Sequence, residues 1–189
     1  MHTVAIIVGS LRRGSLARRI AEEVIPFFPE GFETRNVDIA HLPLYNFDYD
    51  DPSVASLRVP EPYLEFRRAI KESDGVLFVT PENNRTIPAC LKNAVDVASK
   101  PTGDVAWKNL PAGIISHSIG RLGGYSAQKN LRLALSYFDM PMPGQPEVFL
   151  GGSHELLFPE GGFRDESTVE FLRDYVKRFA ALVEQTASR

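Results

Sequence analysis

The chain has 189 residues, enough for one ordinary domain with a substantial buried core. Hydrophobic residues make up 43% of it and charged residues 24%, proportions that are ordinary for a soluble globular protein. The formal net charge of −3 provides no broad basic field. We therefore expect no nucleic-acid partner, and any bound anion must be held by a few placed donors.

Cysteine, histidine and apolar residues exclude further classes. The single cysteine, Cys90, rules out an internal disulfide, which suits a reducing compartment. The four histidines have no metal-ligand spacing, so we expect no metal site. The N-terminus lacks the features of a secretory signal, and no apolar run approaches the roughly 20 residues that span a bilayer. We expect a cytoplasmic protein with no membrane partner.

Strand-like apolar runs alternate with helical periodicities along the chain. The pattern predicts strands over 4–8, 32–39, 75–79, 110–116 and 148–150. It predicts helices over 16–28, 63–73, 88–99, 125–138 and 168–186, with an irregular loop over 41–62. In the second helix we expect Leu64, Ala69 and Ile70 to face the core. The alternation indicates one domain over residues 1–189, a three-layer α/β fold with a parallel sheet and helices on both faces.

Three predicted strands end in polar, loop-like segments. Residues 9–15 follow the first strand, residues 80–85 the third, and residues 116–124 the fourth. Ligands of open α/β sheets bind beyond the carboxyl ends of the strands. We therefore expect these three segments to converge on one ligand site.

The first segment has the groups that a phosphate needs. Its glycines let the backbone turn sharply and approach a ligand closely. Its hydroxyl and charged donors are Ser10, Ser15, Arg12 and Arg13. The helix that begins near Leu16 points free N–H groups at the same place. The segment is neither a Walker loop nor a dinucleotide fingerprint, and an ordinary turn with a capping serine and two solvated arginines remains an alternative.

The second segment is dense in hydrogen-bonding groups directly after an apolar strand: Pro81, Glu82, Asn83, Asn84 and Arg85. A planar polar ring such as a flavin pyrimidine needs donors and acceptors along one edge. Backbone N–H groups there would also stabilise the negative charge that arrives on reduction. The alternative is an Asx-type turn that caps the helix beginning at Pro88.

The third segment is rich in glycine and serine. Its Ser116-His117 pair suggests nucleophilic catalysis, but adjacent residues on an extended chain point to opposite sides. No acidic partner is identifiable, and neither Ser116 nor Ser118 lies in a Gly-x-Ser-x-Gly elbow, so a hydrolase is disfavoured. We interpret Cys90, Trp107 and Tyr125 as packing residues.

Together these segments resemble the NAD(P)H-dependent FMN reductase family, which includes chromate, quinone and azo-dye reductases. The similarity runs in order along nearly the whole chain. It is carried by Val8-Gly9-Ser10-Leu11-Arg12 with Gly14-Ser15, Leu42-Pro43-Leu44-Tyr45-Asn46, Phe78-Val79-Thr80-Pro81-Glu82 with Asn84-Arg85, Ile87-Pro88, Leu91-Lys92-Asn93-Ala94-Val95-Asp96, Gly123-Gly124 and Gln145-Pro146-Glu147.

The resemblance implies a flavodoxin-like fold with a five-stranded parallel sheet of order 2-1-3-4-5, assembled as a homodimer or homotetramer. It implies FMN as cofactor and NADH or NADPH as co-substrate. The flavin would take hydride at N5 and pass electrons to a small-molecule acceptor by a ping-pong mechanism. That acceptor is a quinone, a free flavin, chromate or an azo compound. Catalysis is assigned to the flavin, not to a protein acid or base.

The resemblance also assigns the cofactor-binding residues. The FMN phosphate would be held by Ser10, Arg12, Ser15 and Leu16, with Ala17 at the adjoining position. The isoalloxazine would be lined by Pro81, Glu82, Asn83 and Asn84, and the pocket completed by Ser116 and Ser118.

The chain also departs from the family pattern. Ala17 stands where the family has an asparagine, which removes one phosphate donor, and Asn83 replaces an aromatic residue. Ser126 and Lys129 stand where many members have Arg and Tyr, which changes the expected subunit contacts. Two other functions stay open: a flavodoxin-like electron carrier without efficient NAD(P)H oxidation, and a protein that kept the fold but lost the site.

Overall fold

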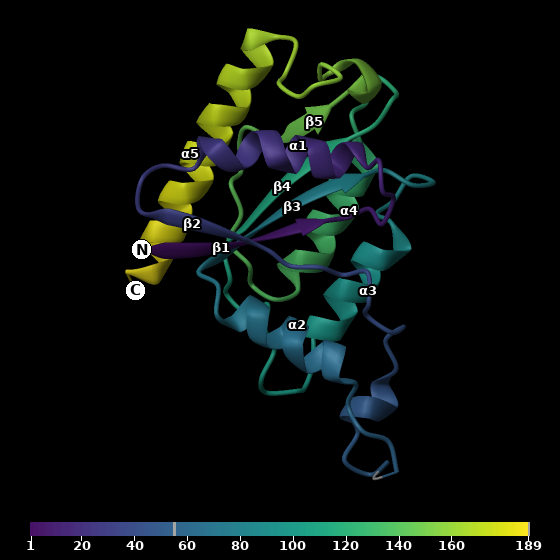
Figure 1. Ribbon diagram of the computed structural model, residues 1–189. Coiled ribbons are helices and arrows are strands. Elements are labelled where there is room, and N and C mark those ends of the chain that lie inside the picture. Colours follow the sequence, from purple (N-terminus) through teal and green to yellow (C-terminus); the bar gives the residue numbers. More distant parts are fainter. Residues whose placement is uncertain (55, 189) are drawn as a thin grey trace.

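The computed structural model describes residues 1–54 and 56–188, and a parallel sheet forms its centre (Figure 1). Its strands are β1 (His2–Val8), β2 (Phe32–Asn36), β3 (Gly75–Pro81), β4 (Ala112–His117) and β5 (Val148–Leu150). Neighbouring strands all pair in parallel, in the order β2-β1-β3-β4-β5. The predicted flavodoxin-like architecture of order 2-1-3-4-5 is confirmed.

Helices cover both faces of the sheet (Figure 1). On one face lie α1 (Leu16–Val24) and α5 (Glu166–Ala187); on the other lie α2 (Glu61–Lys71), α3 (Ala89–Ala98) and α4 (Tyr125–Ser136). Successive side chains of a strand point to opposite faces, so Ala5 and Ile7 pack toward α2, α3 and α4, whereas Val4 and Ile6 pack toward α1 and α5. This double coverage explains why β1, β3 and β4 are buried in continuous runs, whereas the edge strand β2 alternates between half-buried and exposed residues.

Helix α2 differs from the prediction in which side chains it buries. It begins at Glu61 with Pro62 in its first turn, where a missing N–H is tolerated. The buried stripe consists of Tyr63, Phe66, Arg67 and Ile70. The inward orientation predicted for Ile70 is confirmed and Ala69 is partly buried, but that of Leu64 is wrong, since Leu64 is 42% exposed. The helical stripe runs through Tyr63, one position before Leu64.

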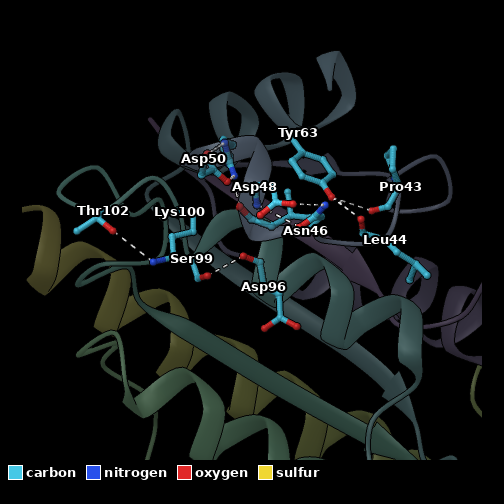
Figure 2. Close-up of polar contacts among 12 residues, drawn as sticks. Pro43, Leu44, Asn46, Asp48, Asp50, Tyr63, Asp96, Ser99, Lys100 and Thr102 are labelled. Carbon is cyan, nitrogen blue, oxygen red and sulfur yellow. Dashed lines mark hydrogen bonds and ion pairs between the residues drawn. The ribbon is translucent and has the colours of Figure 1, made fainter. Parts of the chain in front are cut away.

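Side chains of α2 make polar contacts with the long loop between β2 and α2 (Figure 2). The Tyr63 hydroxyl donates hydrogen bonds to the carbonyls of Pro43 (3.2 Å) and Leu44 (2.8 Å). The Arg67 guanidinium donates to both carboxylate oxygens of Asp50 at 2.9 and 2.7 Å, and the two side chains are only 5% and 3% exposed. These contacts hold Pro43, Leu44 and Asp50 of the loop against α2.

The turn after β1 depends on a close approach between two strand ends. A Cβ atom added at Gly9 would lie 2.7 Å from the Thr80 Oγ1 atom and 3.0 Å from the Leu91 Cδ2 atom. Glycine is therefore the residue that fits between β1 and the end of β3. Farther along the turn, the Ser15 hydroxyl accepts a hydrogen bond from the Arg18 N–H at 3.3 Å, which confirms Ser15 as the N-cap of α1.

We expect Gly9→Ala to lower the free energy of unfolding by about 1–3 kcal/mol, because the added methyl group overpacks the contact with Thr80. Gly14→Ala, in the same loop, is the matched control, since nothing lies within 4 Å of its added Cβ. The control should leave the free energy unchanged or raise it by up to about 1 kcal/mol. Urea denaturation checks both, and equal midpoints for the two variants would contradict the argument.

Candidate functional site

A cavity of about 670 Å³ opens at the carboxyl edge of the sheet. The segments after β1, β3 and β4 contribute to its wall, together with the start of α3 and the segment after β5. Its lining residues are Gly9, Ser10, Leu11, Arg12, Ser15, Leu16, Pro81, Glu82, Asn83, Pro88, Ala89, Cys90, His117, Ser118, Ile119 and Ser153. Its volume suits a small molecule, and its position is where α/β sheets bind ligands.

A second cavity has nearly the same volume, about 660 Å³, but a different position. It lies between α2 and residues 49–52, 54, 57 and 59 of the preceding loop, with further lining from Pro101 and Asp104. Among the described residues that line it, none belongs to the three polar strand-end segments. We therefore take the cavity at the carboxyl edge, hereafter the edge cavity, as the candidate site.

Most of the residues predicted to hold a cofactor line the edge cavity: Ser10, Arg12, Ser15, Leu16, Pro81, Glu82, Asn83 and Ser118. Ala17, Asn84 and Ser116 do not line it. Ala17 is fully buried in the core, and Asn84 is exposed in a turn. The Ser116 hydroxyl donates within the protein instead, with the carbonyl oxygens of Gly123 and Val148 at 2.9 and 3.1 Å.

One end of the edge cavity has the chemistry of an anion site. The Ser15 hydroxyl accepts from the Arg18 N–H, so its own hydrogen stays available for a ligand. Helix α1 directs the partial positive charge of its N-terminus here, and its first turn has no acidic residue. Arg12 adds an exposed guanidinium. These donors fit a phosphate group and need no basic surface elsewhere.

The segment after β3 forms a tight turn. Asn83 and Thr86 exchange backbone hydrogen bonds at 2.9 and 3.0 Å. Between them, Asn84 (φ 49°) and Arg85 (φ 66°) are both left-handed, the conformation of a type I′ turn. The Asn130 side chain donates to the Arg85 carbonyl at 3.1 Å and so ties the turn to α4. The structure has this turn where an Asx-type turn was the alternative.

The Glu82 carboxylate binds to the protein itself. Its Oε2 atom accepts hydrogen bonds from the backbone N–H groups of Ser126 (2.9 Å) and Ala127 (3.2 Å), at the start of α4. The backbone N–H of Glu82 donates to the His117 carbonyl at 3.2 Å. The carboxylate thus compensates the N-terminus of α4, and the backbone N–H of Glu82 joins the second strand-end segment to the third.

Sequence reasoning missed several lining residues, among them Cys90, His117 and Ser153. Cys90 was interpreted as a packing residue; it does pack against the core, and it also lines the edge cavity. Burial raises the pKa of its thiol. Its position just after Pro88, at the start of the helix that follows β3, is the signal that would have placed it at this edge. Trp107 is fully buried, which confirms its packing role.

His117 and Ser153 are buried polar residues at this cavity. His117 is 6% exposed and Ser153 is 1% exposed. Neither ring nitrogen of His117, nor the Ser153 hydroxyl, makes a hydrogen bond to another described residue. Burial lowers the pKa of His117 to about 4, which keeps the imidazole neutral at neutral pH. The Ser116 hydroxyl donates to backbone carbonyl oxygens and not to the His117 ring. Ser116 and His117 therefore do not form a nucleophile–base pair.

We expect His117→Phe to flatten the pH dependence of stability between about pH 6.5 and pH 4. In the unfolded chain His117 has its ordinary pKa of 6.5, whereas in the folded chain its pKa is about 4. The free energy of unfolding of the wild type therefore falls as the pH falls through this window. At pH 4.5 the titration of His117 lowers the free energy of unfolding of the wild type by about 2–3 kcal/mol relative to neutral pH. Urea midpoints at pH 7.5 and 4.5 give the difference. Parallel pH profiles for variant and wild type would contradict the assignment.

Residues 1–54 and 56–188 contain no group of three or more His, Cys, Asp or Glu side chains placed to hold a metal ion. No helix in the same residues is long and apolar enough to cross a membrane.

Comparison with known proteins places this architecture among flavin reductases. Residues 2–155 match the family model described as NADPH-dependent FMN reductase. The chain is 41% identical over 183 residues to a quinone reductase of Pseudomonas putida, covering 97% of this chain and 95% of that protein. It is 37% identical over 180 residues to the 2-hydroxy-1,4-benzoquinone reductase of a Burkholderia species, covering 95% of both.

A solved structure agrees. FerB of Paracoccus denitrificans, a flavoenzyme NAD(P)H:(acceptor) oxidoreductase, superposes with a TM-score of 0.87 at 34% sequence identity. The match covers 98% of this chain and 99% of FerB.

Proposed function

The chain belongs to the NADPH-dependent FMN reductase family, and from this premise we propose that it transfers electrons from NADH or NADPH to a quinone at the edge cavity. It is an oxidoreductase with FMN as cofactor and NAD(P)H as co-substrate. The observation that carries the proposal is the meeting of an anion site after β1 and a rigid polar turn after β3 in one cavity.

In this proposal different residues of the edge cavity contact different parts of FMN. Ser10, Arg12, Ser15 and the backbone at Leu16 would hold the phosphate. The backbone of 81–83 would face the flavin ring, held there by the contact of Glu82 with α4. When bound, FMN supplies the redox chemistry, accepting hydride from the nicotinamide and delivering electrons to the acceptor. The chain orients these groups and shields them from water.

Three of the residues predicted to bind the cofactor would contribute to FMN binding without a side-chain contact. Ala17 has no side-chain donor and is buried, so only its backbone N–H is offered at the start of α1. Asn84 would act by shaping the turn, because its side chain lies outside the edge cavity. Ser116 would act by holding the segment over 116–124 against β5, while Ser118 lines the cavity.

A quinone is the proposed acceptor because relatives over nearly the whole chain are named quinone reductases. Free flavin, chromate and azo compounds are the other acceptors to be compared with it. We further propose that nicotinamide and acceptor use the same open side of the edge cavity in turn, which gives ping-pong kinetics.

We propose a homodimer or homotetramer in the cytoplasm, formed by residues 1–189 as a single FMN-binding domain. An exposed stripe supports self-association: Tyr125, Leu133 and Tyr137 recur at multiples of four residues along α4 and just beyond it, all on one side. We propose neither a nucleic-acid partner nor a membrane partner.

The direct test is anaerobic reduction. The purified chain loaded with FMN is titrated with NADH or NADPH, and the flavin absorbance should bleach and then return when a quinone is added. Initial rates at several quinone concentrations should give parallel double-reciprocal lines. A flavin-loaded chain that neither nucleotide reduces would instead favour the electron carrier, and a chain that takes up no FMN would contradict both.

We expect Arg12→Ala to raise the Kd for FMN by about 10- to 100-fold, because a charge-assisted hydrogen bond to the phosphate is lost. Fluorescence titration of FMN measures the change. Arg13→Ala is the control within the same loop, since Arg13 does not line the edge cavity. If both variants bind FMN as the wild type does, Arg12 is a solvated surface charge.

A further inference from the structure

His117 and Ser153 are an unexplained pair in the edge cavity. Both line it, and both are more than nine-tenths buried. Both carry polar atoms without a hydrogen-bond partner among the described residues. Burying a donor or acceptor without a partner costs stability, and folded proteins seldom keep such groups without a function. Two of them in one cavity indicate that a ligand takes up their hydrogen bonds.

Strand geometry places His117 on the face of the sheet that also carries the anion site, and Ser153 lies beside the segment that follows His117. His117 lies two residues beyond Ile115 on β4, so it faces the same side of the sheet as α1 and α5. That side also carries Ser15 and the start of α1. Ser153 follows β5, and its backbone N–H donates to the Ser118 carbonyl at 3.0 Å. Cys90 belongs to α3, on the opposite face of the sheet.

The chemistry of the pair differs from that of the anion site. The imidazole is neutral in the fold, with one N–H donor and one nitrogen acceptor. The hydroxyl likewise donates once and accepts. Such groups match ligand hydroxyls, which also donate and accept. A phosphate already has Arg12, Ser15 and the N-terminus of α1 as donors.

We propose that His117 and Ser153 bind the ribityl hydroxyls of FMN, the part of the cofactor that adjoins its phosphate. This inference rests on the proposed function, and it concerns side chains to which the family resemblance assigned no part in binding the cofactor. The side chains would turn their buried polar atoms toward the cofactor when it binds. The pair then costs stability in the free chain and contributes affinity in the loaded chain.

Three flavins that differ by one part each provide the test. FMN has the ring, the ribityl chain and the phosphate; riboflavin lacks the phosphate; lumiflavin keeps the ring alone. His117→Phe and Ser153→Ala should each raise the Kd of both FMN and riboflavin by about tenfold and leave that of lumiflavin unchanged. Fluorescence titration measures all three. His154→Phe, an exposed neighbour, is the control and should change none.

Thermal melts without flavin give a second signature. At neutral pH His117→Phe and Ser153→Ala should melt at the wild-type temperature or above it, because each removes a buried polar group that has no hydrogen-bond partner among the described residues.

Two outcomes of the flavin titrations would point elsewhere. Affinity lost only for FMN would mean a phosphate contact, and affinity lost for all three flavins would mean a ring contact or a general packing defect. Either result overturns the proposal, as do unchanged affinities.

A measurement on the wild-type chain avoids variants that fold poorly. With ¹⁵N-labelled histidine, the ring-nitrogen signals of His117 should move when FMN is added, while those of His2 and His41 stay. The signals of His117 are identified by their loss in His117→Phe. If the wild type binds FMN and these signals do not move, this inference alone fails. If it binds no flavin, the proposed function fails with it.

Discussion

The close approach of β1 to the end of β3 is the constraint on which the site depends. Gly9 sits where any Cβ would meet Thr80, so the turn after β1 and the turn after β3 lie against each other. Parallel pairing then brings the end of β4 to the same edge. The edge cavity is a consequence of this packing, because three chain segments leave the sheet side by side and none of them fills the space between.

Charge is distributed locally around that cavity. The chain has a net charge of −3, yet one end of the cavity combines Arg12 with the positive end of α1. Among the described residues that line the cavity, the one carboxylate is that of Glu82, and its charge is compensated by N–H groups of α4. His117 stays neutral through burial. A phosphate can therefore be held without any basic surface around it.

The sequence predicts most of the fold because its strongest signals are local. Continuous apolar runs identify β1 and β3, whereas β2 is predicted from an imperfect alternation, and Ser15 stands at the start of α1. The polar segments after strands identify the edge cavity, since parallel strands end together. What depends on distant contacts escapes prediction. Leu64 is exposed because the buried stripe of α2 is set by packing, and the hydroxyl of Ser116 is taken by Gly123 and Val148.

The same limit applies to the residues that sequence reasoning missed. Nothing in the Ser116-His117 pair reveals that the imidazole is buried without a hydrogen bond to any described residue, because its surroundings come from other strands and loops. Ser153 reaches the cavity only because β5 pairs with β4. The loop before α2 has no periodicity in its sequence, and one of its residues, Asp50, is held by a buried ion pair with Arg67 of α2. Such features belong to tertiary structure and have no signature in a window of sequence.

The most direct measurement is a crystal structure of the chain grown with FMN. We expect the phosphate within hydrogen-bond distance of Arg12, Ser15 and the first N–H groups of α1, with the flavin ring beside the backbone of 81–83. FMN bound in the second cavity, beside α2, or in the edge cavity with its phosphate away from α1, would contradict this expectation.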